Sequence, residues 1–334
     1  MSASEIVQDP AFNQWFVLAM SSDLRPHQAR GYELLNTRVV LWRGTTEVRA
    51  WHDQCPHRGA ALSLGKVHNE ALSCPYHGWA FEGNGRCSRY PAHPDRQPPP
   101  RAHARTFQCI EQDGCLWVSL GKPSHAPPRF MEIDQAEYRS TLVGEWNIKA
   151  NAYRVMENFL DVAHFNFVHP TTLGAGAGAD SSIAAYQVEA YEHGFIARDC
   201  RVVQLRGNLS ADAPAQVLYD YEVLGLTVAA LHKKTDNCSQ ASDVIRLLVV
   251  PVDAHNSVIR MLVSYDYAGI DGIDDLAVIA FNRSILLEDV PILESQRPKE
   301  LPLYTAVELS QPSDSSAIEY RRYLKRLGIK FGTC

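Results

Sequence analysis

Two mixed pairs of cysteine and histidine stand close together in residues 55–79, CPHRGAALSLGKVHNEALSCPYHGW. Cys55 and His57 are two positions apart, and after sixteen further residues Cys74 and His77 are three positions apart. Such a donor set can bind zinc tetrahedrally, or a [2Fe-2S] cluster in which two histidines replace two cysteines on one iron. A zinc finger groups its cysteines together and its histidines together, whereas each pair here is mixed. The spacing therefore favours the cluster, held by two loops, and a structural zinc site is the alternative.

A second group of polar side chains lies within residues 153–169, which are otherwise largely apolar. We expect a helix here, buried because apolar residues surround its axis almost completely. Asn158, Asp161 and His164 recur at every third position, so they advance along one flank of the helix and can point together into an interior site. Because burying polar groups without partners costs free energy, these three residues are candidates for a functional site.

A metal is the simplest reason for two histidines to converge inside a protein. The proline after His169 pushes that residue out of helical geometry, which lets it turn back towards His164. A carboxylate from another element would complete the triad of two histidines and one acid that holds non-haem Fe(II) and leaves positions open for oxygen. The segment LLEDVPILESQRP offers Glu288 and Asp289 just before a proline that is expected to kink the helix. We favour Asp289 as the ligand, with Glu288 as the alternative.

Short strands must hold the two Cys/His pairs of residues 55–79. Residues 31–55 are rich in Val, Leu, Trp and Tyr, Asn84-Gly85 suits a tight hairpin, and residues 114–121 are typical of a closing strand. A proline-rich segment at 122–130 then interrupts the pattern. We therefore predict an all-β domain at residues 1–125 and a second domain at residues 126–334.

The second domain combines strands with helices. Strand-like runs follow residues 153–169, and helical signals return at 274–296 and in a last helix that ends at Gly328. The pattern predicts an antiparallel sheet with helices at its beginning and end, which makes the chain α+β. The strands between residues 200 and 270 are expected to wall a pocket. Carboxylates on them, Asp220, Glu222 and Asp266, could meet a cationic ligand, although solvated strand faces explain them equally well.

The composition argues against nucleic-acid and membrane partners. The 334 residues are 46% hydrophobic, and the 32 basic and 38 acidic side chains, with a net charge of −6, form no basic stripe or polybasic patch. No apolar stretch is long enough for a transmembrane helix. The N-terminal residues do not resemble a secretory signal, so we expect a cytoplasmic protein with reduced cysteines. The six cysteines without histidine companions are expected to be small buried hydrophobes: Cys87, Cys109, Cys115, Cys200, Cys238 and Cys334.

Taken together, the two Cys/His pairs and the polar residues of 158–169 with Asp289 resemble the Rieske non-haem iron oxygenases, in their terminal oxygenase component. PHRG and PYHGW are similar to the family's cluster loops, and ENFLDVAHFNFVH and EDVPILESQRP are similar to its iron-binding segments. The resemblance covers the whole chain and implies a Rieske [2Fe-2S] module followed by a START-like helix-grip catalytic domain. It implies that His164, His169 and Asp289 are the ligands of a mononuclear Fe(II), that Asp161 is a bridging residue, and that Asn158 is the asparagine of the family motif.

Within the family, the chain looks most like short monooxygenases: the N-demethylases of methylxanthines and the cyanobacterial hydroxylases of saxitoxin-type alkaloids. The resemblance implies a head-to-tail homotrimer in which His77 of one subunit reaches Asp161 of the next, and Asp161 contacts His164. It also implies O₂-dependent hydroxylation of a C–H bond, or N- or O-dealkylation, of a small nitrogen-rich heterocycle. Since the chain has no glycine fingerprint for a dinucleotide in the right context, electrons from NAD(P)H require a separate reductase or ferredoxin.

Two other functions stay open on the sequence. Cis-dihydroxylation of an arene would use the same cofactors, and only the resemblance to monooxygenases ranks it second. In another class, a non-catalytic Rieske electron carrier or redox sensor would join the cluster to a ligand-binding domain. Iron analysis separates these classes, because a carrier holds about two irons per chain and an oxygenase about three.

Overall fold

The computed structural model describes residues 9–176, 181–205, 209, 214–235, 242–266, 273–304 and 307–334. These residues form two compact units, one of residues 12–129 and the other of residues 9–11 together with 130–334. Among the helices of these ranges, none combines the length and the apolar character that crossing a lipid bilayer requires.

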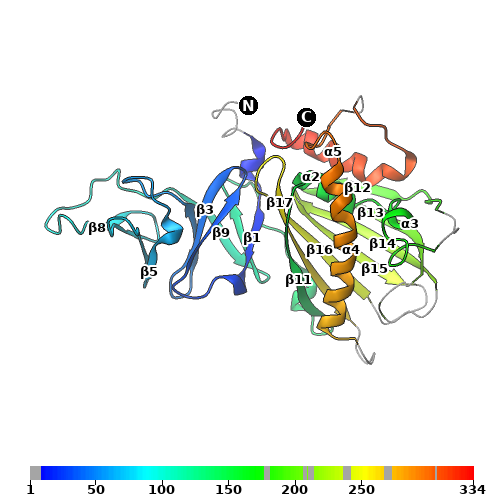
Figure 1. The fold of residues 1–334 in the computed structure, drawn as a ribbon, viewed down its shortest axis with the longest axis horizontal. Coiled ribbons are helices and arrows are strands. Elements are labelled where there is room, and N and C mark those ends of the chain that lie inside the picture. The colour runs from blue at the N-terminus through cyan, green and yellow to red at the C-terminus, as the bar shows by residue number, and fades with distance from the viewer. Residues whose placement is uncertain are drawn as a thin grey trace. The chain divides into compact units, whose positions relative to one another are not determined.

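Short antiparallel strands make up the first unit, as predicted (Figure 1). The larger sheet has the order β1-β10-β9-β4-β3-β2, and the smaller sheet has the order β5-β6-β7-β8. Their bounds are β1 Phe16–Met20, β2 Ala29–Leu34, β3 Thr37–Arg43, β4 Val48–His52, β5 Lys66–His68, β6 Ala71–Ser73, β7 Ala80–Glu82, β8 Cys87–Arg89, β9 Thr106–Gln112 and β10 Cys115–Ser119. The predicted hairpin at Asn84-Gly85 joins β7 to β8, and Gly85 has a φ of 88°, which glycine adopts without strain.

Aromatic rings form the core of the first unit. Trp42 and Trp51 are buried and meet edge-on with their ring centroids 4.8 Å apart, and Trp51 packs against Phe81 of the smaller sheet at 6.5 Å. Cys55 and Cys74 are buried in the same hydrophobic cluster. The two cysteine-bearing loops therefore rest on a close-packed base, which restricts their motion.

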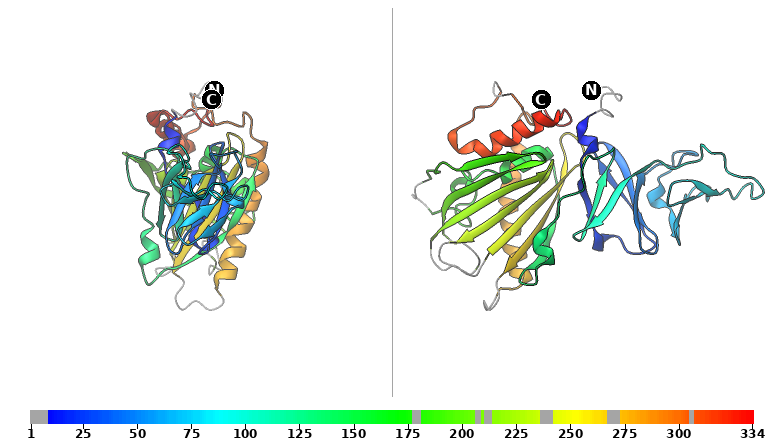
Figure 2. Two further views of the ribbon diagram at one scale, coloured as in Figure 1. Left: turned by 90° about the vertical axis from the view of Figure 1, so that its left-hand side faces the viewer. Right: turned by 180° about the vertical axis from the view of Figure 1, so that it is seen from behind.

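A seven-stranded antiparallel sheet, crossed by one long helix, dominates the second unit. Its order is β11-β17-β16-β15-β14-β13-β12. The strands are β11 Arg139–Ile148, β12 Gln187–Tyr191, β13 Gly194–Gln204, β14 Ala215–Gly225, β15 Val228–Thr235, β16 Ser242–Pro251 and β17 Ser257–Asp266; the helices are α2 Ala152–Phe159, α3 Phe165–Val168, α4 Asp275–Ser295 and α5 Ser315–Leu327. Helix α4 lies in front of the sheet in Figure 1 and behind it in the rear view of Figure 2, so it covers one face. The α+β class is confirmed.

The prediction of one continuous helix over residues 153–169 is wrong. Helix α2 ends at Phe159, and the four-residue helix α3 begins only at Phe165. In between, the Asp161 carboxylate accepts a hydrogen bond from the backbone N–H of Ala163 at 2.8 Å. Such a side-chain bond offers the backbone an alternative to the helix, which the apolar pattern did not reveal. His169 has a φ of −118° and a ψ of 48°, outside helical geometry, as its proline neighbour predicted.

The last two helices follow their predicted bounds closely. Helix α4 begins after the N-cap Asp274 and continues past Pro291 to Ser295, so the proline does not end it. Helix α5 stops at Gly328, whose φ of 73° is the left-handed conformation that commonly ends a helix.

Asn151 ties helix α2, which carries Asn158, to two other segments. Its side-chain oxygen accepts hydrogen bonds from the N–H groups of Tyr153 and Arg154, and its Nδ2 donates to the carbonyls of Ala254 and Gly332 at 2.6 and 3.0 Å. The residue is buried. Replacing it would therefore uncap the helix and also leave two carbonyl groups without their donor.

We expect Asn151→Ala to destabilise the second unit by about 2–4 kcal/mol, because a lost cap and lost buried hydrogen bonds add. The matched variant Asp274→Ala removes only an exposed cap, whose oxygen accepts from the Ala277 N–H at 2.9 Å, and should cost about 1 kcal/mol. Thermal and urea unfolding followed by circular dichroism measures both. Equal losses in the two variants would contradict the anchoring role of Asn151.

Candidate metal centres and substrate pocket

The two cysteine-histidine loops of the first unit contain the same kind of backbone turn. The N–H of Gly59 donates to the carbonyl of Cys55 at 2.9 Å, and the N–H of Gly78 donates to the carbonyl of Cys74 at 3.1 Å. Both glycines adopt positive φ values, 75° and 70°. Glycine at these positions lets the backbone of each loop reverse its direction directly after the Cys/His pair. The glycines of PHRG and PYHGW are thus explained by the turn that brings cysteine and histidine to one side.

The four side chains of these loops form one compact donor set. The Cys55 thiol lies within hydrogen-bonding contact of Cys74, and burial, with a contribution from this neighbour, raises the pKa of Cys55 to about 11. The rings of His57 and His77 are 4.6 Å apart between centroids, and His57 stacks on Trp79 at 4.5 Å. Both cysteines are buried, whereas His77 is exposed. Two inner sulfurs and two outer imidazoles fit a [2Fe-2S] cluster whose histidine-bound iron faces the surface.

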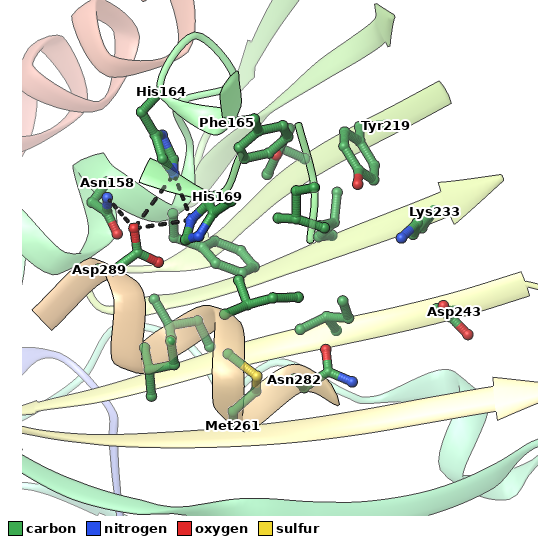
Figure 3. Close-up of a pocket in the computed structure, with 18 of the residues that line it drawn as sticks. Asn158, His164, Phe165, His169, Tyr219, Lys233, Asp243, Met261, Asn282 and Asp289 are labelled. Carbon is green, nitrogen blue, oxygen red and sulfur yellow. Dashed lines mark hydrogen bonds and ion pairs between the residues drawn. The ribbon is translucent and has the colours of Figure 1, made fainter. Parts of the chain in front are cut away.

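Three side chains converge in the second unit, at the position that the sequence predicted (Figure 3). The Nε2 atoms of His164 and His169 are 3.2 Å apart. Oδ1 of Asp289 is 3.5 Å from the first of these nitrogens and 3.2 Å from the second. Neighbouring ligand atoms around a metal with bonds of about 2.1 Å lie roughly 3 Å apart, so the arrangement fits a mononuclear metal ion.

Each of the three converging groups has a further hydrogen-bond partner: the two imidazoles at their far nitrogens, and Asp289 at the same oxygen that faces them. Nδ1 of His164 lies 3.1 Å from Asp161 Oδ2, and Nδ1 of His169 lies 2.6 Å from Glu288 Oε2. Asn158 Nδ2 donates to Asp289 Oδ1 at 3.2 Å. A carboxylate behind a ligand imidazole fixes its tautomer and its orientation, an arrangement common around metals. Of the two acids that the sequence left open, Asp289 faces both Nε2 atoms and Glu288 contacts the opposite side of His169.

The charges around this centre favour a cation. Burial opposes a charge on His169, yet the hydrogen bonds and charges of Asp289 and Glu288 outweigh it and raise the pKa of that imidazole. Three carboxylates, those of Asp161, Glu288 and Asp289, surround two imidazoles. This excess of negative charge provides the electrostatic attraction that a divalent metal ion requires.

A pocket opens beside the three converging groups, between α4 and the sheet. It is lined by Val155, Asn158, Phe159, His164, Phe165, His169, Leu173, Tyr219, Tyr221, Leu231, Lys233, Asp243, Ile245, Leu247, Met261, Phe281, Asn282, Ile285, Leu286 and Asp289. Most of these side chains are apolar, which suits a small organic molecule. His164, His169 and Asp289 all line it, so a bound molecule would lie directly against them.

The expected carboxylates are not part of this lining. Tyr219 and Tyr221 point into the pocket, and since side chains alternate along a strand, Asp220 and Glu222 between and beside them face the other way. Asp266, at the end of β17, does not line the pocket either. Apart from Asp289, the acidic and basic residues of the wall are Lys233 and Asp243, which sequence reasoning missed.

The remaining cysteines only partly follow the prediction. Cys87, Cys115 and Cys200 are buried thiols, as expected. Cys109 is half-buried and Cys334 is exposed at the end of the last described segment, so the prediction of burial is wrong for Cys334. Cys238 lies outside the described residues.

Comparisons with known proteins agree with the two units. A Rieske [2Fe-2S] domain model matches residues 14–110, and a vanillate O-demethylase oxygenase C-terminal domain model matches residues 148–329. Methylxanthine N1-demethylase NdmA of Pseudomonas putida is 31% identical over 302 residues, which cover 88% of this chain and 81% of that protein. The solved structure of P. putida CBB5 NdmA with caffeine aligns with a TM-score of 0.82 at 27% identity, over 95% of this chain and 90% of that one.

A further relative matches a smaller part of the chain. The oxidoreductase NdmD of P. putida is 41% identical over 125 residues, which cover 37% of this chain and 21% of that protein. The two family models together with the long match to a demethylase show the family. The chain belongs to the Rieske non-haem iron oxygenases, as a monooxygenase component that uses a Rieske [2Fe-2S] cluster and a mononuclear iron.

Proposed function

We propose that this monooxygenase removes a methyl group from nitrogen in a small heterocycle. The observation that carries the proposal is the open pocket against the His164, His169 and Asp289 side chains, in a chain similar to a methylxanthine N1-demethylase over most of its length. In this reaction O₂, two electrons and two protons place one oxygen atom on the methyl carbon, as a hydroxyl group, and release the other as water. The carbon then leaves as formaldehyde, and the ring nitrogen keeps a proton.

The proposal assigns the donor atoms of both centres. Cys55, Cys74, His57 and His77 would hold the cluster, and His164, His169 and Asp289 would hold Fe(II). When bound, the cluster supplies single electrons and the iron supplies the activation of O₂. Around them, the protein's apolar pocket walls exclude water and press the substrate against the triad. Asp161, Glu288 and Asn158 keep the ligand groups in their orientation.

We further propose the head-to-tail homotrimer that the family resemblance implies. Asp161 and His164 line a second concavity, whose rim includes the exposed apolar residues Leu309 and Ile292. Near the Cys/His loops of the first unit, Leu64 and Tyr76 are exposed apolar side chains as well. These exposed apolar side chains would be covered at the contact between subunits in the proposed trimer. In the trimer, His77 of one subunit would contact Asp161 of its neighbour and continue through that neighbour's His164.

A separate reductase completes the proposed system. The similarity to part of the oxidoreductase NdmD is one support, and the missing dinucleotide fingerprint in the sequence is another. Electrons would pass from NAD(P)H through this reductase or a ferredoxin to the cluster. Cis-dihydroxylation of an arene stays the second candidate in the enzyme class, and the electron carrier is disfavoured by the convergence of His164, His169 and Asp289.

Reoxidation of the reduced cluster tests the proposed function. The protein is reduced anaerobically and mixed with oxygenated buffer, and the visible absorbance is followed alone and with methylxanthines, guanidinium alkaloids, aromatic acids and arenes. We expect a methylated heterocycle to accelerate reoxidation and to yield formaldehyde, with about three irons per chain. Uniformly slow reoxidation together with about two irons per chain would replace the enzyme by a carrier.

Neighbouring acids on α4 should differ sharply in iron binding. We expect Asp289→Ala to abolish retention of Fe(II), and Glu288→Ala to weaken it by about 10- to 100-fold, because only the first removes a ligand atom. Arg283→Ala, on the exposed side of the same helix, is the matched control. Chelator competition measures the affinity while cluster absorbance reports an intact first unit. The reverse order of the two acids would make Glu288 the ligand.

The substitution Asp161→Asn tests whether Asp161 connects the [2Fe-2S] cluster with the mononuclear iron. Asparagine keeps the oxygen that accepts from the Ala163 N–H, so the local turn should survive, but it cannot accept a hydrogen bond from His164 through its amide nitrogen. We expect both metals to be retained and most of the substrate-coupled turnover to be lost. Near-normal turnover in this variant would exclude Asp161 as the bridge.

A further inference from the structure

A buried lysine and an acid lie opposite each other on neighbouring strands, in one row of paired residues that faces the pocket. Such a row is called a rung below. In the strand register, Lys233 of β15 pairs with Tyr219 of β14 on one side and with Asp243 of β16 on the other. All three side chains line the pocket. The next lysine along the strand, Lys234, is exposed, as the alternation of side chains requires. The pocket wall therefore carries a cation and an anion side by side.

The Lys233 ammonium has no hydrogen-bond or ion-pair partner within the described residues. Only 4% of the residue is exposed, and its nitrogen lies 5.8 and 6.0 Å from the ring centroids of Tyr219 and Phe281. Burial lowers the pKa of Lys233, and the charge of Asp243 partly opposes this shift. Because an ammonium without an acceptor is costly in such surroundings, the site lacks an oxygen atom that a ligand can supply.

The charged rung and the metal ligands lie at opposite ends of the pocket. Figure 3 shows Lys233 and Asp243 across the pocket from His164, His169 and Asp289. The adjacent inward rung, Tyr221, Leu231 and Ile245, is formed by large side chains with apolar bodies. A substrate that reaches both ends must therefore have a polar edge at one end and the carbon to be oxidised at the other.

We infer that Lys233 and Asp243 anchor the substrate through an edge that carries a carbonyl oxygen beside an N–H, as in a lactam, imide or ureide. This inference rests on the proposed function, since it takes the pocket beside the triad as the substrate site. Lys233 donates to the carbonyl oxygen, and an Asp243 oxygen accepts from the N–H. A neutral ligand leaves the two protein charges balanced, whereas a carboxylate ligand would be attracted by Lys233 and repelled by Asp243.

Binding measured without turnover tests the anchor. Iron-loaded, oxidised protein is titrated under argon with 3-methylxanthine, which has imide N–H and carbonyl groups, with caffeine, which keeps the carbonyls but has no N–H, and with 3-methoxybenzoate. The proteins are the wild type, Lys233→Met, Asp243→Asn and the matched control Lys234→Met. Circular dichroism verifies that each variant is folded.

We expect Lys233→Met to weaken the binding of both purine diones by about tenfold or more, since it removes a charged hydrogen bond. Asp243→Asn should weaken 3-methylxanthine and leave caffeine unchanged, and Lys234→Met should change neither. Unchanged affinity for both purine diones in Lys233→Met would overturn the anchor and leave Lys233 a cation held by its two rings. Saturable binding of 3-methoxybenzoate alone, or no saturable binding of either dione to the wild type, would overturn the neutral ligand class.

The same titration separates this inference from the proposed function. If the variants shift affinity as expected but no dione accelerates cluster reoxidation in the wild type, the anchor stands and the proposed demethylation fails. If a methylated heterocycle accelerates reoxidation while Lys233→Met binds it as tightly as the wild type, the proposed function stands and the anchor fails.

Discussion

The second unit depends on holding two imidazole nitrogens and one carboxylate oxygen within 3.2 to 3.5 Å of one another. Atoms with lone pairs repel at this distance unless a proton or a cation lies between them. The protein offsets this cost with neighbouring side chains: Asp161 and Glu288 bind the far sides of the two imidazoles, and the Asn158 amide donates to the same Asp289 oxygen that faces them. The ring orientations are therefore set by the fold, and a metal ion would complete an arrangement that is already organised.

In the first unit, backbone hydrogen bonds rather than side chains hold the Cys/His loops in shape. Two loops use the same reversal, each closed by a glycine N–H that donates to the cysteine carbonyl. The turns place Cys55 and Cys74 on the aromatic core and leave His77 at the surface. The two thiols are therefore shielded from solvent, whereas the His77 imidazole is accessible.

The pocket between α4 and the sheet separates its two polar ends by an apolar middle. One end holds the three converging ligand groups, and the other holds Lys233 and Asp243 on paired strands. Strand alternation produces this division, because each inward rung is followed by an outward one and successive inward rungs can differ completely in polarity. Selectivity would then depend on the spacing between two polar ends as much as on the shape of the walls.

Sequence alone determined the features that local geometry controls. The donor types and spacing of the Cys/His loops, the release of His169 by its proline and the end of α5 at Gly328 all follow from residues that are close in the sequence. The helix break after Phe159 was missed, although it is also local. There, the side-chain bond of Asp161 competes with the helix, and the apolar pattern gives no measure of which one is stronger.

Tertiary structure decided which neighbour faces the site. Glu288 and Asp289 differ by about 100° around α4, so only the rotation at which the helix packs on the sheet turns Asp289 towards the two Nε2 atoms. Likewise, His232, Lys233 and Lys234 are all polar, and their pattern does not indicate which face of β15 is inward. The pairing of Lys233 with Tyr219 and Asp243 settles that, because long-range strand register fixes the direction of every side chain along the strand.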